Sequence, residues 1–267
     1  MTAVDYNGQT TLITGASAGL GAEFARQLAA RGSDLVLVAR RKDRLEKLAA
    51  ELRRHHGIEV HVLALDLATG NPGQALIERL EPLGLHVTSV INNAGFASFG
   101  AFHQADPERL RREIAVDVTA VADISRAFIE QLRTAGRGVL VNVASMAAYQ
   151  PNPRMALYGA TKAFVLSLTE ALWEESRGTG LRVLALSPGA TRTEFFDVVG
   201  TDRAAGGTKL ASPVDVVHTA LTALDRRNPP PSVIAGRMNR VMAVLARRLA
   251  TRRQVIRAVG RLTAEQA

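Results

Sequence analysis

A serine, a tyrosine and a lysine in the second half of the chain are of the types that exchange a proton with a carbonyl oxygen. Tyr158 and Lys162 are four residues apart in a stretch of helical composition, so their side chains share one face. A free tyrosine has a pKa of about 10, and a nearby ammonium group lowers it toward neutral pH. Tyr158 would then act as acid or base, and Ser145 would orient the substrate oxygen. The same Y-x-x-x-K spacing also occurs on ordinary solvated helix faces.

A glycine-rich turn near the N-terminus predicts a phosphate site. Residues 14–21 read TGASAGLG, with glycines at 15, 19 and 21. Glycines there allow a tight turn, close approach of a phosphate to backbone N–H groups, and close packing of the following helix, whose N-terminus favours an anion. The spacing differs from the commoner G-x-G-x-x-G. The alternative is a turn needed only for packing. The expected dinucleotide contacts are Gly15, Ser17, Ala18, Gly19, Leu20 and Gly21.

The end of the second apolar run indicates which dinucleotide binds. A sheet that binds NAD typically places an acid here for the ribose 2′-hydroxyl, whereas this chain has Ala39 followed by Arg40 and Arg41. Guanidinium groups suit a 2′-phosphate, which favours NADP(H) over NAD(H). Arg40, directly after the strand, is the preferred contact. Alternatively, both arginines only begin a solvated helix. Asp66, after the third strand, is placed either to meet the adenine amino group or to cap the next helix.

Strands and helices alternate along the chain at short spacing. This alternation predicts an α/β fold, a doubly wound parallel sheet in a single domain. The expected strands are 10–14, 34–39, 60–65, 87–91, 139–143, 181–186 and 232–234. The expected helices are 22–31, 44–55, 74–83, 116–134, 155–177 and 213–226. Residues 1–236 form the predicted dinucleotide-binding and catalytic domain, and 237–267 a basic helical extension.

Composition excludes several classes of protein. The 267 residues contain no cysteine, which excludes disulfide scaffolds and thiol nucleophiles, and we expect no metal site. No apolar run or basic apolar leader predicts a membrane span or a secretory signal, so a cytoplasmic location is the default expectation. The formal charge is +8, but residues 226–267 alone carry ten arginines and one acid, leaving −1 for the rest. The basicity therefore belongs to the tail, and nucleic acid is not an expected partner.

Taken together, these motifs resemble those of the short-chain dehydrogenase/reductase family. The resemblance runs from about residue 8 to 236 through TGASAGLG at 14–21, Asp66, NNAG at 92–95, Ser145, YGATK at 158–162 and SPGATRT at 187–193. It implies a Rossmann-type sheet of seven parallel strands and hydride transfer between NAD(P)(H) and a carbonyl or alcohol. It also implies homotetramers or homodimers formed through two long helices. By resemblance, Tyr158 is the general acid or base, Lys162 lowers its pKa and holds the nicotinamide ribose, and Ser145 polarises the substrate oxygen. Further cofactor contacts implied are Leu67, Asn92, Asn93, Ala94, Gly95, Tyr158, Pro188, Gly189, Thr191 and Thr193. Asn92 would also stabilise the sheet.

One position departs from the family pattern. Where the family usually has an asparagine that takes part in a proton relay to the lysine, this chain has Asp117. A backbone carbonyl there would serve equally well with either residue. A carboxylate near Lys162 would also pair with it and change how strongly Lys162 depresses the pKa of Tyr158. We therefore expect Asp117 to act with the catalytic residues and to alter the pH dependence of turnover.

Apolar residues near the catalytic motifs predict a hydrophobic carbonyl or alcohol substrate, although several of them would be ordinary core. The candidates are Phe96, Phe99, Met146, Tyr149, Met155, Phe195, Phe196, Val198 and Val199. The segment 190–211, rich in Gly and Thr, has the composition of a closing lid.

The basic tail predicts two amphipathic helices. An apolar stripe runs through Met238, Val241, Met242, Leu245 and Leu249, and Thr251 with Gln254 resembles a capping box. Such helices pack on the body, roof the substrate pocket, join subunits, or bind weakly to an anionic membrane surface. A non-catalytic dinucleotide-binding protein stays an alternative for the whole chain, as does a membrane-surface lipid carbonyl reductase.

Overall fold

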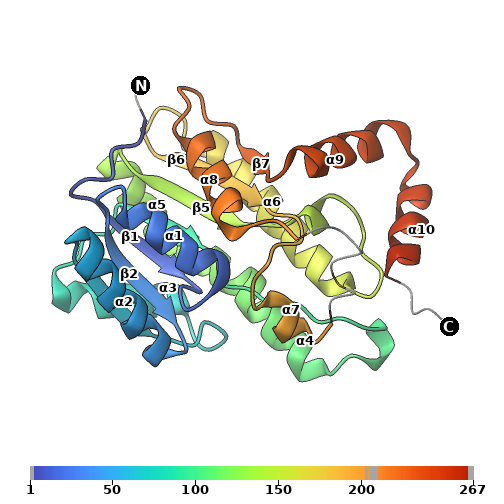
Figure 1. Cartoon of the computed structure of the whole chain (residues 1–267), viewed down its shortest axis with the longest axis horizontal. Helices are drawn as coiled ribbons and strands as arrows, with labels where there is room; N and C mark the ends of the chain where they lie inside the picture. Colours follow the sequence, from blue (N-terminus) through green and yellow to red (C-terminus); the bar gives the residue numbers. More distant parts are fainter. Residues whose placement is uncertain (1–2, 202–203, 205–209, 264–267) are drawn as a thin grey trace.

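In the computed structural model, residues 3–201, 204 and 210–263 are described, with backbone alone for 244 and 246–249. Seven parallel strands form one sheet in the order β3-β2-β1-β4-β5-β6-β7. The strands are β1 Thr10–Thr14, β2 Asp34–Ala39, β3 Val60–Ala64, β4 Ser89–Asn92, β5 Val139–Val143, β6 Arg182–Ser187 and β7 Ser232–Ile234. This confirms the predicted doubly wound α/β sheet (Figure 1).

Helices cover both faces of the sheet because successive strand residues point to opposite sides. Ile13 and Leu35 pack with α1, α2 and α8, whereas Leu12 and Val36 pack with α3 and α5. The helices are α1 Gly19–Ala29, α2 Lys42–His56, α3 Pro72–Leu80, α4 Pro107–Ile114, α5 Ala120–Ala135, α6 Ala156–Glu175, α7 Phe195–Val199, α8 Pro213–Leu224, α9 Arg237–Leu249 and α10 Arg252–Leu262. Short 3₁₀ turns also occur at Glu81–Leu83, Phe102–Gln104 and Met146–Tyr149.

The predicted long helix at 116–134 begins earlier and is interrupted. It starts as α4 at Pro107, capped by Asp106, which accepts a hydrogen bond from the Glu108 N–H. A π-helical turn, Ala115–Thr119, joins α4 to α5. A π turn inserts a residue into the helix and is found frequently at functional sites. Here it contains Asp117, the position that departs from the family pattern.

The C-terminal segment forms two helices beside the α/β body (Figure 1). Thr251 and Gln254 make both hydrogen bonds of the predicted capping box. Among the described residues, no helix is long and apolar enough to cross a membrane. In the predicted lid 190–211, residues 202–203 and 205–209 lie outside the described part, and Phe195–Val199 forms the unpredicted helix α7.

Candidate active site

One cavity of about 1230 Å³ brings the predicted motifs together at the carboxyl ends of the strands. Its walls include the glycine-rich turn, the Asn93–Gly95 segment, the loop after β6 and the two tail helices. Ser145, Tyr158 and Lys162 line the same cavity. The site for a dinucleotide and the site for proton transfer are therefore continuous.

The glycine-rich turn leaves a helix N-terminus open to the cavity. Helix α1 has Ala18 at its N-cap, with no side-chain capping bond and no acid in its first turn. Gly15 has a φ of +66°, and a Cβ on Gly21 would lie 2.3 Å from the Gly15 carbonyl oxygen. The backbone therefore holds this shape only with glycine at both positions, and its free N–H groups fit a pyrophosphate. Gly21 itself is a packing residue and does not line the cavity.

Arg41, rather than the preferred Arg40, contacts the glycine-rich turn. Its Nη2 donates to Ser17 Oγ at 3.0 Å, and its Nη1 donates to Glu194 at 2.8 Å. The guanidinium groups of Arg41 and Arg44 lower the pKa of Glu194 by hydrogen bonding. Arg40 also lines the cavity and, like Arg41, is exposed. The preference for Arg40 over Arg41 as the contact of a 2′-phosphate stays a prediction.

Asp66 and Asn93 line the cavity, whereas Asn92 lies inside the sheet. Asp66 lines the cavity, and it both caps the following turn, through the Ala68 N–H at 3.0 Å, and pairs with Arg112 at 3.0 Å. Asn93 lines the cavity and donates to the Thr14 carbonyl at 2.9 Å. Asn92 has the second of its two implied roles, since it lies inside the sheet and donates to Asn142 Oδ1 at 2.9 Å. Asn92 holds neighbouring strands together and does not line the cavity.

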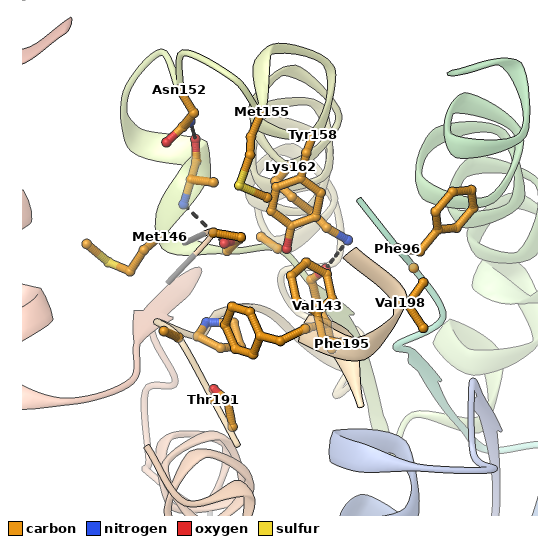
Figure 2. Close-up of a pocket in the computed structure, with 18 of the residues that line it drawn as sticks. Phe96, Val143, Met146, Asn152, Met155, Tyr158, Lys162, Thr191, Phe195 and Val198 are labelled. Atoms are coloured by element: carbon orange, nitrogen blue, oxygen red, sulfur yellow. Dashed lines mark hydrogen bonds between the residues drawn. The ribbon is translucent and has the colours of Figure 1, made fainter. Parts of the chain in front are cut away.

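Tyr158 and Lys162 project from α6 toward the end of β5 (Figure 2). The Lys162 ammonium donates to the Val143 carbonyl at 3.2 Å and lies 5.5 Å from the Tyr158 ring centroid. Both side chains are buried, at 4% and 9% exposure. Phe195 lies across from the Tyr158 ring, 5.5 Å between centroids. The phenol is thus held between a cation and an apolar wall.

Burial raises the pKa of Tyr158 above its ordinary value, and Lys162 offsets only part of that rise. The expected net lowering was therefore wrong for the chain alone. The reason is that burial of the phenol is the largest effect on its pKa and outweighs the lowering by the Lys162 ammonium. A hydrogen bond from Ser145 also lowers the pKa of Tyr158, whereas the Asp117 carboxylate raises it. A phenol with a raised pKa is protonated at neutral pH, the form that donates a proton.

Asp117 is fully buried and pairs with Lys162, as its position predicted. Its Oδ2 lies 3.2 Å from Lys162 Nζ, and its Oδ1 accepts from the Phe96 N–H at 3.0 Å. Burial raises the pKa of Asp117. Burial is the largest single effect on Lys162 and opposes its charge, but Asp117, Tyr158 and Glu113 together outweigh burial, and the pKa of Lys162 is raised. A Cβ on Gly95 would lie 3.0 Å from Lys162 Nζ, so glycine there leaves room for the ion pair.

The substrate side of the cavity is mostly apolar. Of the predicted residues, Phe96, Met146, Met155, Phe195, Phe196 and Val198 line it. Tyr149, Phe99 and Val199 do not. The Tyr149 hydroxyl instead lies 3.3 Å from Ser187 Oγ, because the 3₁₀ turn that carries it faces β6.

Sequence reasoning missed residues from two regions. The tail supplies a wall of the cavity that includes Met242, Leu245, Val255 and Leu262. Of the alternatives for the tail helices, this is the one in which they roof the substrate pocket. Arg109 lines the cavity and donates to the Ala97 and Val198 carbonyls at 2.9 and 3.0 Å. Glu113, one turn further along α4, is fully buried. The sequence does hold a signal for Glu113. The apolar stripe of Ile124 and Ala120, followed toward the N-terminus in steps of three or four residues, reaches Asp117 and then Glu113, which places both carboxylates on the buried face of the helix.

Comparison with known proteins agrees with this geometry. Residues 9–204 match the family model described as short chain dehydrogenase. The chain belongs to the short-chain dehydrogenase family. Its relatives are nicotinamide-dependent oxidoreductases of alcohols and carbonyls, and so is this chain.

Two curated relatives of this short-chain dehydrogenase differ in substrate. It is 37% identical to a sulfoacetaldehyde reductase of Chromohalobacter salexigens, over 79% of this chain and 81% of the relative. It is 31% identical to a 7beta-hydroxysteroid dehydrogenase of Collinsella aerofaciens, over 87% and 88%. A solved short-chain dehydrogenase from Sphingobium yanoikuyae in complex with NADPH is 35% identical, with a TM-score of 0.78 over 97% of both chains. Other solved relatives are complexes with NAD or 5-hydroxy-NADP, so similarity supports a nicotinamide dinucleotide without choosing between the two.

Proposed function

We propose that this short-chain dehydrogenase uses NADP(H) to interconvert an apolar carbonyl compound and its alcohol, with Tyr158 as the general acid and base. The observation that carries the proposal is one cavity that holds the open N-terminus of α1, Arg41 and the Ser145, Tyr158 and Lys162 side chains together. The nicotinamide ring of the bound dinucleotide supplies or accepts the hydride. A regulatory protein that only binds dinucleotide has no need of all three side chains.

Each of the three side chains has a separate task. Ser145 donates to the substrate oxygen and fixes its position beside the phenol. Tyr158 gives its proton to that oxygen during reduction and removes it during oxidation. Lys162, held by Asp117 and Val143, stabilises the phenolate left after proton donation and would hydrogen-bond the nicotinamide ribose. Leu67, Pro188, Gly189, Thr191 and Thr193 line the cavity where the dinucleotide would extend.

We expect the purified chain to bind NADPH more tightly than NADH. Replacing Arg41 with alanine should weaken NADPH binding by about tenfold or more, because it removes a charge-assisted hydrogen bond to the 2′-phosphate. NADH affinity should change by less than about twofold, since NADH lacks that phosphate. Fluorescence or calorimetric titrations with both dinucleotides measure the two effects. We expect Arg40→Ala to have the smaller effect, because Arg41 is the arginine that hydrogen-bonds Ser17 in the glycine-rich turn.

Arg54→Ala is the matched control, because it removes the same charge from an exposed position of the same helix. It should leave both affinities unchanged. Equal affinities of the unaltered chain for NADPH and NADH would show that the preference for NADP(H) is wrong. The proposed reaction would then be tested with NADH and NAD instead.

The lining of the cavity favours a bulky apolar substrate over a small anion. Phe96, Met155, Phe195 and the tail residues Met242 and Leu262 enclose the space in front of Tyr158. Apolar walls stabilise apolar surface removed from water, and Arg109, a cation that also lines the cavity, already donates to Ser98 Oγ and to the Ala97 and Val198 carbonyls. The two curated relatives name both kinds of substrate, a sulfoacetaldehyde and a hydroxysteroid. Comparing kcat/KM for cyclic ketones and for sulfoacetaldehyde tests the proposal, and a preference for the anion would contradict it.

We propose, as a second candidate, that the tail binds an anionic membrane surface beside the mouth of the cavity. Exposed apolar side chains follow α9, with Met238 at 72%, Val241 at 50% and Met242 at 59% exposure. The sequence has no acid between Arg226 and Ala264, and the tail arginines would repel a second tail. Apolar side chains among arginines fit anionic lipid, and an apolar substrate would then enter from the bilayer.

Sedimentation with vesicles tests this surface. We expect the chain to sediment with phosphatidylglycerol vesicles, much less with phosphatidylcholine vesicles, and less at high salt. Replacing Met238 and Val241 with serine should reduce binding several-fold, because neither lines the cavity and both are exposed. Val214→Ser, at a residue 52% exposed on α8, is the control. Equal sedimentation of all three chains, or none at all, would contradict the membrane contact.

The assembly of the chain into homotetramers or homodimers and its cytoplasmic location stay predictions.

A further inference from the structure

Glu113 is a buried carboxyl group that the reaction described above does not use. It lies in the last turn of α4 and is 0% exposed. Among the described residues, neither of its carboxylate oxygens has a hydrogen-bond partner of ordinary geometry. Ser98 favours the ionised form through its side chain and backbone, but burial disfavours the charge more strongly, so the neutral acid is better tolerated. Burial raises the pKa of Glu113 to about 7, so it changes charge near neutral pH.

Glu113 lies next to the groups that control Tyr158. Asp117 follows it by one turn, and the Asp117 carboxylate helps to raise the pKa of Glu113. On α6, negative charge on Glu113 raises the pKa of both Lys162 and Tyr158. The other nearby cation is Arg109, on the same helix, which favours the ionised form of Glu113.

The charges in this buried group do not balance when every member is ionised. Asp117 and Lys162 form one ion pair at 3.2 Å. Arg109 is directed elsewhere, since its guanidinium bonds Ser98 Oγ at 3.1 Å and the Ala97 carbonyl at 2.9 Å. A second buried carboxylate therefore leaves an unpaired negative charge beside the phenol, which opposes formation of a phenolate.

We propose that Glu113 is a positioning residue whose charge governs when Tyr158 ionises. The proposal rests on the proposed acid–base role of Tyr158. With Glu113 neutral, Tyr158 loses its proton more easily, which favours alcohol oxidation. With Glu113 ionised, Tyr158 keeps its proton, which favours carbonyl reduction. Glu113 thus extends reduction toward higher pH and delays oxidation.

Glu113→Gln tests this coupling because the amide keeps the shape of the acid and never gains the charge. The pH profiles of the two chains should coincide at pH 5, because protonated Glu113, like the glutamine of the variant, carries no charge there. They should diverge above pH 7, where alcohol oxidation by Glu113→Gln should be about threefold faster, because Tyr158 loses its proton more easily without the Glu113 charge. Reduction should decline at a lower pH than in the unaltered chain. Glu130→Gln, at an exposed position of α5, is the control and should change neither profile.

Two further measurements need no turnover. In chains labelled with ¹³C at the glutamate carboxyl groups, the resonance that Glu113→Gln removes should titrate near pH 7, well above an ordinary glutamate. The phenolate absorbance of Tyr158, isolated by subtracting the spectrum of Tyr158→Phe, should appear at lower pH when Glu113→Gln is also present.

A resonance that titrates in the ordinary glutamate range would overturn the inference, as would an unchanged phenolate titration. A constant difference in rate at every pH would show a purely structural role and would also overturn it. If no carbonyl or alcohol is turned over, the proposed function fails, but the two spectroscopic titrations still decide whether Glu113 acts on Tyr158.

Discussion

Tyr158→Phe should reduce carbonyl reduction and alcohol oxidation by about 10² to 10⁴-fold, the usual contribution of a positioned acid or base. The substitution removes only the hydroxyl group. The ring keeps its contact with Phe195, 5.5 Å between centroids, and its place beside Lys162. Affinity for the dinucleotide should change by less than about twofold, because the phenol proton serves the substrate oxygen. Turnover measured with a cyclic ketone, together with a dinucleotide titration, separates the two effects.

Tyr6→Phe is the matched control for that loss. The Tyr6 hydroxyl is buried and has no hydrogen-bond partner among the described residues, and Tyr6 packs in the core on the α1 face of the sheet. Losing this hydroxyl should leave turnover unchanged. A Tyr158→Phe chain with turnover within tenfold of the unaltered chain would show that another group supplies the proton. A simultaneous loss of dinucleotide binding would instead indicate a collapsed site.

The architecture was predictable because it depends on local patterns. Apolar runs such as 34–39 are typical of strands buried on both faces, and TGASAGLG has a strand before it and a helix after it. Element boundaries were less predictable. Nothing local in AVDVT distinguishes a π turn from continuous helix, and the turn forms where it and α4 pack against α6.

The chemistry of the site was predictable in its residues but not in its electrostatics. Tyr158, Lys162 and Ser145 are identified by type and spacing. Whether Lys162 lowers the pKa of Tyr158 below its ordinary value depends on burial and on competing anions, which only the packed structure supplies. Tyr149 illustrates the same limit, since its type suits a substrate pocket but its turn directs the hydroxyl to Ser187. Glu113 was missed because a glutamate on a charged helix is usually solvated.

The buried ion pair of Lys162 and Asp117 should also carry a large share of the stability of this region. Lys162→Met removes the cation from a pair that is 4% and 0% exposed and leaves the Asp117 carboxylate without compensation. Breaking such a pair by removing one partner typically destabilises a protein by about 3–5 kcal/mol. We expect the free energy of unfolding in urea at pH 7 to fall by about that amount. Turnover should be lost as well, because the phenolate loses its cation.

A second substitution tests whether the unpaired charge causes the loss. Asp117→Asn, added to Lys162→Met, removes the stranded carboxylate, so the double variant should be more stable than Lys162→Met by about 1–3 kcal/mol although it stays inactive. A merely sterically damaged site would instead be destabilised further by the second change. The pair therefore separates two demands on the same residues. Stability requires only that the buried charges balance, whereas catalysis requires that the positive member lies beside Tyr158. A Lys162→Met chain within about 1 kcal/mol of the unaltered protein would show that the ion pair contributes little to the fold.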